Sequence, residues 1–363
     1  MLNASNNNTG CQPQKMHLFI PCLLGVSFAL GFVLNAISLW IFWFRIKRWN
    51  STTVLQFNLA ISDAIVTPAA ALILIYSVTD DWTYGTFLCQ LTVFLLSTNM
   101  YGSVYFLTLI SLHRYFSVVH NVKGALLTQI SFIKKICLIV WGCLVLQGIP
   151  FFFLLKTSKI QGTTKCLNIH QSEMALLYFV WNTVFLVSGL IAPFGIIIIC
   201  YVLLSRFILK MNPLNAMSKT MKSKSIHTIS MSLAIFIICY VPLHITRTIA
   251  VTVKLFFPMY CRLLETVEIM YYITWMLTGT NCSLDPILYC FASERFYYLF
   301  RDSFTFFSCQ AKICSNGTEA PTQSEDAVSG VTRESHLNPI TTGIIALELA
   351  SLPSPVAHIP SKN

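Results

Sequence analysis

Charged side chains are scarce in this sequence. Asp, Glu, Lys and Arg make up only 10% of its 363 residues, whereas hydrophobic residues make up 55%. A soluble domain needs far more polar surface, so this composition excludes one. Apolar windows of roughly 20 residues, long enough to cross about 30 Å of hydrocarbon, recur along the chain instead.

The residue sets of an enzyme or a metal centre are also missing. The sequence has no CxxC pair, no Cys/His cluster with metal-ligand spacing and no nucleophile–base set, so we expect neither catalysis nor a zinc site. It has no internal repeat or inverted half-to-half symmetry, which argues against a secondary transporter. The formal charge of +10 needs no nucleic-acid partner, because basic residues facing an anionic leaflet explain it.

The apolar windows predict an all-α membrane protein, since lipid offers no partner for free backbone groups and each span must be helical. The expected spans are seven: Leu18–Phe44, Val54–Val78, Leu88–Val119, Phe132–Leu155, Ala175–Leu209, Ile226–Val253 and Glu265–Ala292. They form one membrane domain, residues 18–308. An outer N-terminus, 1–17, precedes it, and a tail rich in Ser, Thr, Pro and Gly, 309–363, follows and is expected to be disordered.

Basic residues beside the spans set the orientation, because cytoplasmic loops carry the excess of Lys and Arg. They include Arg45, Lys47, Arg48, Lys134, Lys135, Arg206, Lys210, Arg295 and Arg301. Arg45 and Lys47 also mark the first span as a retained helix rather than a signal peptide. The N-terminus is therefore expected outside the cell in a multi-pass plasma-membrane protein, and glycosylation sequons at Asn3 and Asn7 fit that side.

The 13 cysteines divide by this topology. Most lie within spans as small apolar packers. Four lie on the oxidising side, namely Cys11, Cys89, Cys166 and Cys261, and four cysteines allow three pairings. We favour Cys89–Cys166, which leaves Cys11–Cys261.

Aromatic residues alternate with Arg295 and Arg301 after the seventh span, and this pattern predicts a short amphipathic helix on the inner leaflet. Cys309 and Cys314 follow and are placed for palmitoylation, with plain free thiols as the alternative.

Ionisable residues inside spans are unfavourable in lipid and by default mark function. Arg114 ends the third span and Asp285 lies in the seventh. Together with other short motifs they make the chain resemble the rhodopsin-like (class A) G-protein-coupled receptors, over every span. The motifs run from Gly31 to Asn35, Asn58 to Asp63 and Trp82 to Gly85, through His113-Arg114-Tyr115, Trp141, Pro193 with Tyr201, and Phe236 to Pro242, to Asp285-Pro286-Ile-Leu-Tyr289.

The resemblance implies roles for these residues. Arg114, between His113 and Tyr115, would engage the C-terminal helix of a G-protein α-subunit, with Tyr201 and Tyr289 closing over it in the active state. Val104, Pro193, Phe236 and Pro242 would form a two-state packing core. His113 departs from the pattern, because most relatives have an acid before the arginine, and Lys222 stands where some offer a second acid.

The resemblance also implies a sodium ion among the mid-membrane polar residues Asp63, Asn99, Ser103, Asn281 and Asp285. Oxygen ligands around an acidic centre suit such an ion. The alternative is a neutral hydrogen-bond network with Asp63 protonated.

The sixth span carries Phe236, Tyr240, His244 and Arg247 on one helical face. The stretch around His244 and Arg247 resembles purinergic nucleotide receptors and their lipid- and carboxylate-sensing relatives. It implies a ligand site of Tyr240, His244, Arg247 and Trp275, with Arg247 pairing an anionic group. Val93 and Trp275 stand where nucleotide receptors carry further basic residues, so a lipid or carboxylate ranks above a nucleotide. Arg247 could instead snorkel outward or pair with a glutamate of the seventh span.

The sequence thus predicts a receptor that binds a small extracellular ligand and activates a heterotrimeric G protein. Receptor kinases and arrestin would act on the tail. The alternatives are an atypical receptor that couples weakly, for which His113 is the hint, and a channel or transporter, which would need polar residues along a continuous path rather than in one cluster.

Overall fold

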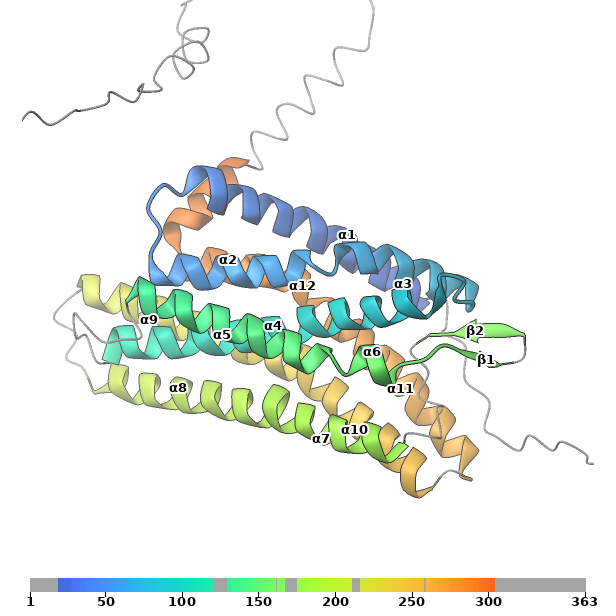
Figure 1. Cartoon of the computed structure of the whole chain (residues 1–363). Coiled ribbons are helices and arrows are strands. Elements are labelled where there is room, and N and C mark those ends of the chain that lie inside the picture. Colours follow the sequence, from blue (N-terminus) through green and yellow to red (C-terminus); the bar gives the residue numbers. More distant parts are fainter. Residues whose placement is uncertain are drawn as a thin grey trace, which may run out of the picture. The chain divides into compact units, whose positions relative to one another are not determined.

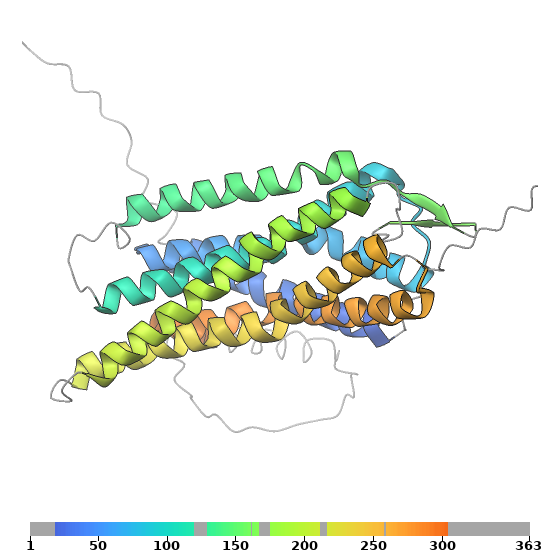
Figure 2. The ribbon, with the colours of Figure 1, turned by 90° about the horizontal axis from the view of Figure 1, so that it is seen from below.

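Helices account for nearly all of the chain that the computed structural model describes, which comprises residues 19–119, 129–160, 162–166, 175–210, 216–257 and 259–303. The helices are α1 (Phe19–Trp40), α2 (Ser51–Ala64), α3 (Thr67–Thr79), α4 (Gly85–Val119), α5 (Ile130–Gly148), α6 (Phe151–Leu154), α7 (Ala175–Leu186), α8 (Ala192–Leu209), α9 (Ala216–Ile235), α10 (Val241–Phe256), α11 (Cys261–Gly279) and α12 (Asn281–Ala292). Three π-helical turns join them, namely η1 (Ile41–Arg45), η4 (Val187–Ile191) and η5 (Phe236–Tyr240). The long helices pack side by side (Figures 1 and 2).

Six of these described helical runs are long and apolar enough to cross a membrane: Phe19–Arg45, Ser51–Thr79, Gly85–Val119, Ile130–Leu154, Leu176–Leu209 and Ser223–Phe256. The seventh span is α11 followed by α12, interrupted at Thr280. Arg262, Glu265 and Glu268 make α11 less apolar than the others. The predicted seven-helix bundle is confirmed.

Prolines explain most of the interruptions within spans, because a proline has no N–H to give the carbonyl four residues earlier. Pro286 lies inside α12, and the Cys282 carbonyl that it leaves free accepts a hydrogen bond from Asn35 Nδ2 of α1 at 2.7 Å. In the π-helical turn η5, just before Pro242, the Cys239 carbonyl accepts one from Thr278 Oγ1 at 2.5 Å. Side chains of neighbouring helices thus satisfy backbone groups that lipid could not.

A short hairpin, which the sequence analysis did not predict, lies between α6 and α7. Strands β1 (Ser158–Ile160) and β2 (Thr163–Lys165) pair antiparallel, with Ile160 opposite Thr163. Gly162 at the turn has a φ of +84°, which favours glycine. The strand segments are too short and too polar to stand out as a sheet, which is why an all-α reading missed them.

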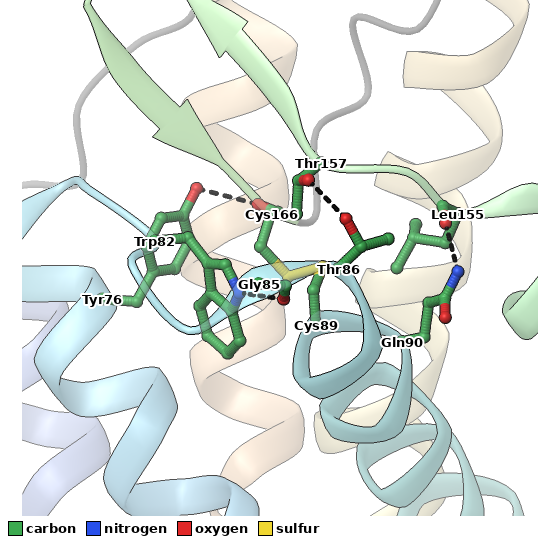
Figure 3. Close-up of a disulfide and its surroundings, with 9 residues drawn as sticks. All are labelled: Tyr76, Trp82, Gly85, Thr86, Cys89, Gln90, Leu155, Thr157 and Cys166. Atoms are coloured by element: carbon green, nitrogen blue, oxygen red, sulfur yellow. Dashed lines mark hydrogen bonds between the residues drawn. A yellow bond between two sulfur atoms is a disulfide. The ribbon is translucent and has the colours of Figure 1, made fainter.

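A disulfide joins this hairpin to the bundle, and the predicted Cys89–Cys166 pair is confirmed (Figure 3). Tyr76 Oη donates to the Cys166 carbonyl at 2.8 Å, and Thr86 and Thr157 share a hydrogen bond of 2.8 Å across the same junction. Lys165 pairs with Asp80 at 2.5 Å. Cys261 is also disulfide-bonded; Cys11, its expected partner, lies outside the described residues.

The helix expected after the seventh span begins as predicted, since residues 294–303 are helical after a break at Ser293. Phe296 is fully buried and packs against Phe42 and Tyr289, with ring centres 4.9 and 5.6 Å apart. The predictions for Asn3, Asn7, Cys309, Cys314 and the tail fall outside the described residues.

We expect Cys89→Ser and Cys166→Ser to reduce cell-surface expression and to lower the melting temperature of the purified protein. The bond closes a loop of 77 residues and so restricts the unfolded chain by a few kcal/mol in the entropic account. Cys143→Ser is the matched control, because Cys143 is free and exposed. Equal melting temperatures for all three variants would contradict a structural role for the bond.

Candidate functional site

A cavity of about 180 Å³ opens within the half of the bundle that carries the hairpin and the Cys89–Cys166 disulfide. Side chains from α1, α4, α7, α10 and α11 line it, and most of them are apolar or aromatic. Its cationic lining residues, among those the structure describes, are Arg247 and Lys254 of α10. A largely apolar hollow with few polar groups is the usual form of a small-molecule site.

Arg247 is held at the cavity by aromatic neighbours. Its Nη1 donates to Tyr101 Oη at 3.3 Å, and its Cζ lies 5.4 Å from the centre of the Phe185 ring. Tyr101 in turn stacks on Phe185 at 4.6 Å. Gly189 allows this approach, because a Cβ there would lie 2.3 Å from the Tyr101 ring. A guanidinium has five N–H donors, so this arrangement orients Arg247 and leaves donors for a ligand.

The structure separates the four residues expected to bind ligand into two pairs. Arg247 and Trp275 line the cavity, whereas Tyr240 and His244 are buried and are not among its lining residues. Tyr240 Oη accepts a hydrogen bond from Asn281 Nδ2 at 2.7 Å. His244 packs edge-on against Tyr101 with ring centres 6.0 Å apart. One helical face therefore carries a residue that lines the cavity, Arg247, and one that supports Tyr101, His244.

Sequence reasoning missed several lining residues, including Tyr178 and Tyr271, because aromatic residues within spans give no signal that distinguishes a cavity from a core. Lys254 lies one residue beyond the expected end of the sixth span at Val253; that boundary is wrong, since Lys254 is in the last turn of α10 and lines the cavity. The signal was present in its distance from Arg247, two helical turns along the same face. The expected alternative pairing of Arg247 with a glutamate is not what the structure has, because Arg247 bonds Tyr101.

A second polar group lies deeper, between α2, α4 and α12. Asp63 Oδ1 accepts hydrogen bonds from Asn99 Nδ2 at 3.1 Å and from Ser103 Oγ at 3.0 Å. Asp285 is close enough to Asp63 for the two carboxyl groups to interact electrostatically. When both carboxyl groups are ionised, Asp63 Oδ2, Asn281 Oδ1 and both oxygens of Asp285 are buried without a hydrogen-bond partner in the described chain, whereas a proton on either group lets the two share a hydrogen bond. The structure therefore brings the five residues expected around a sodium ion into one buried region with four unpartnered oxygens.

The described residues contain no group of three or more His, Cys, Asp or Glu side chains that could hold a metal ion. A site at Asp63 and Asp285 would thus rest on two carboxyl groups with amide and hydroxyl oxygens. Such a weak, oxygen-only donor set suits a monovalent ion better than zinc.

The expected packing core lies just outside that polar group. Val104 and Phe236 are fully buried in one hydrophobic cluster. Phe236 stacks on Phe194, beside the buried Pro193, at 6.0 Å and meets Tyr240 edge-on at 5.3 Å. Pro242 follows the η5 turn that carries Phe236.

At the opposite end of the bundle, Arg114 Nη2 donates a hydrogen bond to the Ala292 carbonyl at the end of α12. His113 beside it is buried. Tyr289 is fully buried against Phe42, and Tyr201 is half-buried on α8. Lys224 of α9 forms an ion pair with Glu294, which joins this end of the sixth span to the helix after α12. The side chain of Lys222 lies outside the described part of the chain.

Comparisons with known proteins agree with this geometry. The model of the family described as 7 transmembrane receptor (rhodopsin family) matches residues 34–289. The chain is similar to purinoceptor 2 of Homo sapiens, with 32% identity over 291 residues, which covers 79% of this chain and 76% of that protein. It is 34% identical over 284 residues to purinoceptor 4 of Rattus norvegicus, covering 77% of each chain. It is 31% identical over 300 residues to purinoceptor 1 of Meleagris gallopavo, covering 81% of this chain and 82% of that one.

Proposed function

Because the chain belongs to the rhodopsin family of seven-transmembrane receptors, we propose that it responds to a small anionic ligand with an apolar body. A carboxylate metabolite or an anionic lipid would bind in the Arg247 cavity from outside the cell. Membership of the family makes it a multi-pass plasma-membrane protein that signals through heterotrimeric G proteins rather than an enzyme. The ligand class is the proposed part.

The single observation that carries the ligand class is the environment of Arg247. Its guanidinium is fixed by Tyr101 and Phe185 at the edge of a cavity that is otherwise mostly apolar. A pre-oriented guanidinium in an apolar wall suits one carboxylate or phosphate on an apolar molecule, because the charge-assisted bond is strongest where water is excluded.

A nucleotide is the second candidate, since the relatives named above are purinoceptors. A polyphosphate carries several charges, and the described lining supplies Arg247 and Lys254 against them. Lys165 of the hairpin could have added positive charge, but its Nζ forms an ion pair with Asp80 Oδ1 at 2.5 Å. The cavity therefore fits a less charged ligand better.

Arg247→Ala should lower the potency of an anionic agonist roughly tenfold to a hundredfold, as expected for loss of a charged hydrogen bond. Arg247→Lys should restore only part of it, because the planar fork is lost. The measurement is G-protein activation in cells over a panel of carboxylates, lysophospholipids and nucleotides, at matched surface levels. Unchanged potency of the active compound in Arg247→Ala would remove Arg247 from the site, and a response confined to nucleotides would reverse the ranking.

We also propose that Asp63, Asn99, Ser103, Asn281 and Asp285 hold a sodium ion. The support is the fit of the donors, because four buried oxygens of this group lack a partner within the described chain. An ion there would offset the charge of two carboxyl groups and so stabilise the arrangement in which α2 and α12 lie close. The residues themselves would orient the oxygens through the Asn99 and Ser103 hydrogen bonds.

Sodium chloride should therefore raise the melting temperature of the purified receptor by roughly a few degrees over N-methyl-D-glucamine chloride at equal ionic strength. Asp63→Asn should abolish the difference, because it removes the carboxylate that both hydrogen bonds orient. Ser62→Ala is a control, since Ser62 Oγ donates to the Leu59 carbonyl of its own helix rather than to Asp63. A sodium effect of equal size in Asp63→Asn would favour the neutral hydrogen-bond network.

We further propose that the receptor signals without ligand, because Arg114 bonds a carbonyl rather than a carboxylate at the inner end. His113 stands beside Arg114 where an acid would hold it, and a carbonyl gives the guanidinium no charge of opposite sign. The missing interaction is worth about 1 kcal/mol at a partly exposed site, which corresponds to a severalfold change in the ratio of inactive to active states.

His113→Asp should lower basal G-protein activation severalfold, at equal surface level, by placing a carboxylate beside Arg114. His113→Asn is the matched control, because it changes size and polarity similarly but adds no charge. The readout is basal activity against receptor number across a range of expression levels. Background activity in the parent, together with no effect of His113→Asp, would reject this account.

A further inference from the structure

Lys254 is the second cation of the Arg247 cavity, and none of the described residues forms a hydrogen bond with its ammonium group. Its Nζ is buried and has no hydrogen-bond partner among the described residues. A lysine in the last turn of a helix ordinarily snorkels to water or bonds the terminal carbonyls. In the described chain this ammonium does neither, although it lies in the last turn of α10. A buried cation without a partner is unfavourable until an anion joins it.

The two cations lie at different depths of one wall. Arg247 and Lys254 are two helical turns apart on the same face of α10, a rise of about 10 Å. Arg247 is the deeper, beside Tyr101 and Phe185, and Lys254 is close to the outer end of the helix at Phe256. Both line the cavity.

The wall between them is apolar. Ala250 and Val251 lie between the two cations on α10, and Phe151, Leu155 and Trp275 line the cavity from other elements. A ligand that reached both cations would therefore place an apolar segment along this stretch and an anionic group at each end.

Among the described residues, an acidic side chain of the seventh span acts on Lys254. Glu268 of α11 is within electrostatic range of it. The Glu268 carboxylate accepts a hydrogen bond from Tyr272 Oη at 2.9 Å and forms no hydrogen bond with Lys254 Nζ. Glu268 thus weakens the attraction of an anion to Lys254 without occupying the hydrogen-bond donors of the ammonium.

We propose that Lys254 is a second anion-binding contact of this cavity, so that its ligand is an elongated molecule with two anionic groups separated by an apolar segment of about 10 Å. The inference rests on the proposed function, in which Arg247 binds the first anionic group, and specifies the ligand class further. Arg247 holds the inner group, Lys254 the outer one, and the apolar wall selects against ligands whose charges are adjacent.

The test compares linear α,ω-dicarboxylic acids, from octanedioate to tetradecanedioate, with their mono-methyl esters. Each ester keeps the length of its diacid and removes one charge. Binding to the purified full-length receptor is measured by the ligand-induced rise in melting temperature, in the parent and in Arg247→Gln, Lys254→Gln and Glu268→Gln. Lys159→Gln, an exposed lysine of the hairpin, controls for general surface charge. A nucleoside diphosphate, whose charges are adjacent, is the third class of probe.

At an intermediate chain length, the diacid should bind about tenfold tighter than its ester, the size of effect expected for a charged hydrogen bond. Lys254→Gln should remove that difference and leave the ester unchanged, Glu268→Gln should increase it, and Lys159→Gln should do nothing. Loss of binding of both compounds in Arg247→Gln is the signature of the proposed function.

Two results overturn the inference while leaving the proposed function in place. One is equal affinity of diacid and ester with sensitivity to Arg247→Gln alone. The other is that the nucleoside diphosphate binds and no diacid does, which would mean that Lys254 contacts adjacent anionic groups rather than a separate one. If neither Arg247→Gln nor Lys254→Gln changed the affinity of the compound that binds, both proposals would be overturned.

Discussion

The bundle depends on satisfying backbone carbonyls where a proline or a π-helical turn interrupts the regular helix and water is absent. In lipid an unpaired carbonyl is strongly unfavourable, so every interrupted turn needs a partner from a neighbouring helix. Asn35 serves the Cys282 carbonyl before Pro286, and Thr278 serves the Cys239 carbonyl before Pro242. These bonds join the first span to the seventh and the seventh to the sixth. These interruptions therefore set which helices must stay in register.

The outer end of the bundle is held by a different kind of constraint. The hairpin between α6 and α7 is too short to be stable alone, so the Cys89–Cys166 bond and the Lys165–Asp80 ion pair fix it to α4 and α3. This attachment leaves Lys165 unavailable to a ligand. The charge of the cavity consequently depends on α10, which supplies both Arg247 and Lys254.

The sequence predicted the spans, the orientation and the disulfide well, because lipid and an oxidising exterior impose strong, local compositional rules. It also predicted which polar residues meet at Asp63, since motif positions on known helices determine their depth. It did not predict that His244 and Tyr240 are buried away from the cavity lining, because a shared helical face does not say where the neighbouring helix closes over it. Lys254 was misplaced for the related reason that a helix end cannot be located to within a turn from hydropathy.

The sixth span links the two ends of the molecule. Its outer half, α10, carries the cations of the cavity, η5 carries Phe236, and its inner half, α9, carries Lys224 in an ion pair with Glu294. The π-helical turn before Pro242 has i→i+5 hydrogen bonds in place of the α-helical ones, so the span is not one regular α-helix. A ligand that draws Arg247 and Lys254 toward it would move α10, and the irregular turn η5 would change conformation first. Phe236 packs on Phe194 and Tyr240 bonds Asn281 in this turn. Asn281 and Ala292 lie on the same short helix, α12. A shift of α12 would therefore affect both the Tyr240–Asn281 hydrogen bond and the hydrogen bond from Arg114 to the Ala292 carbonyl.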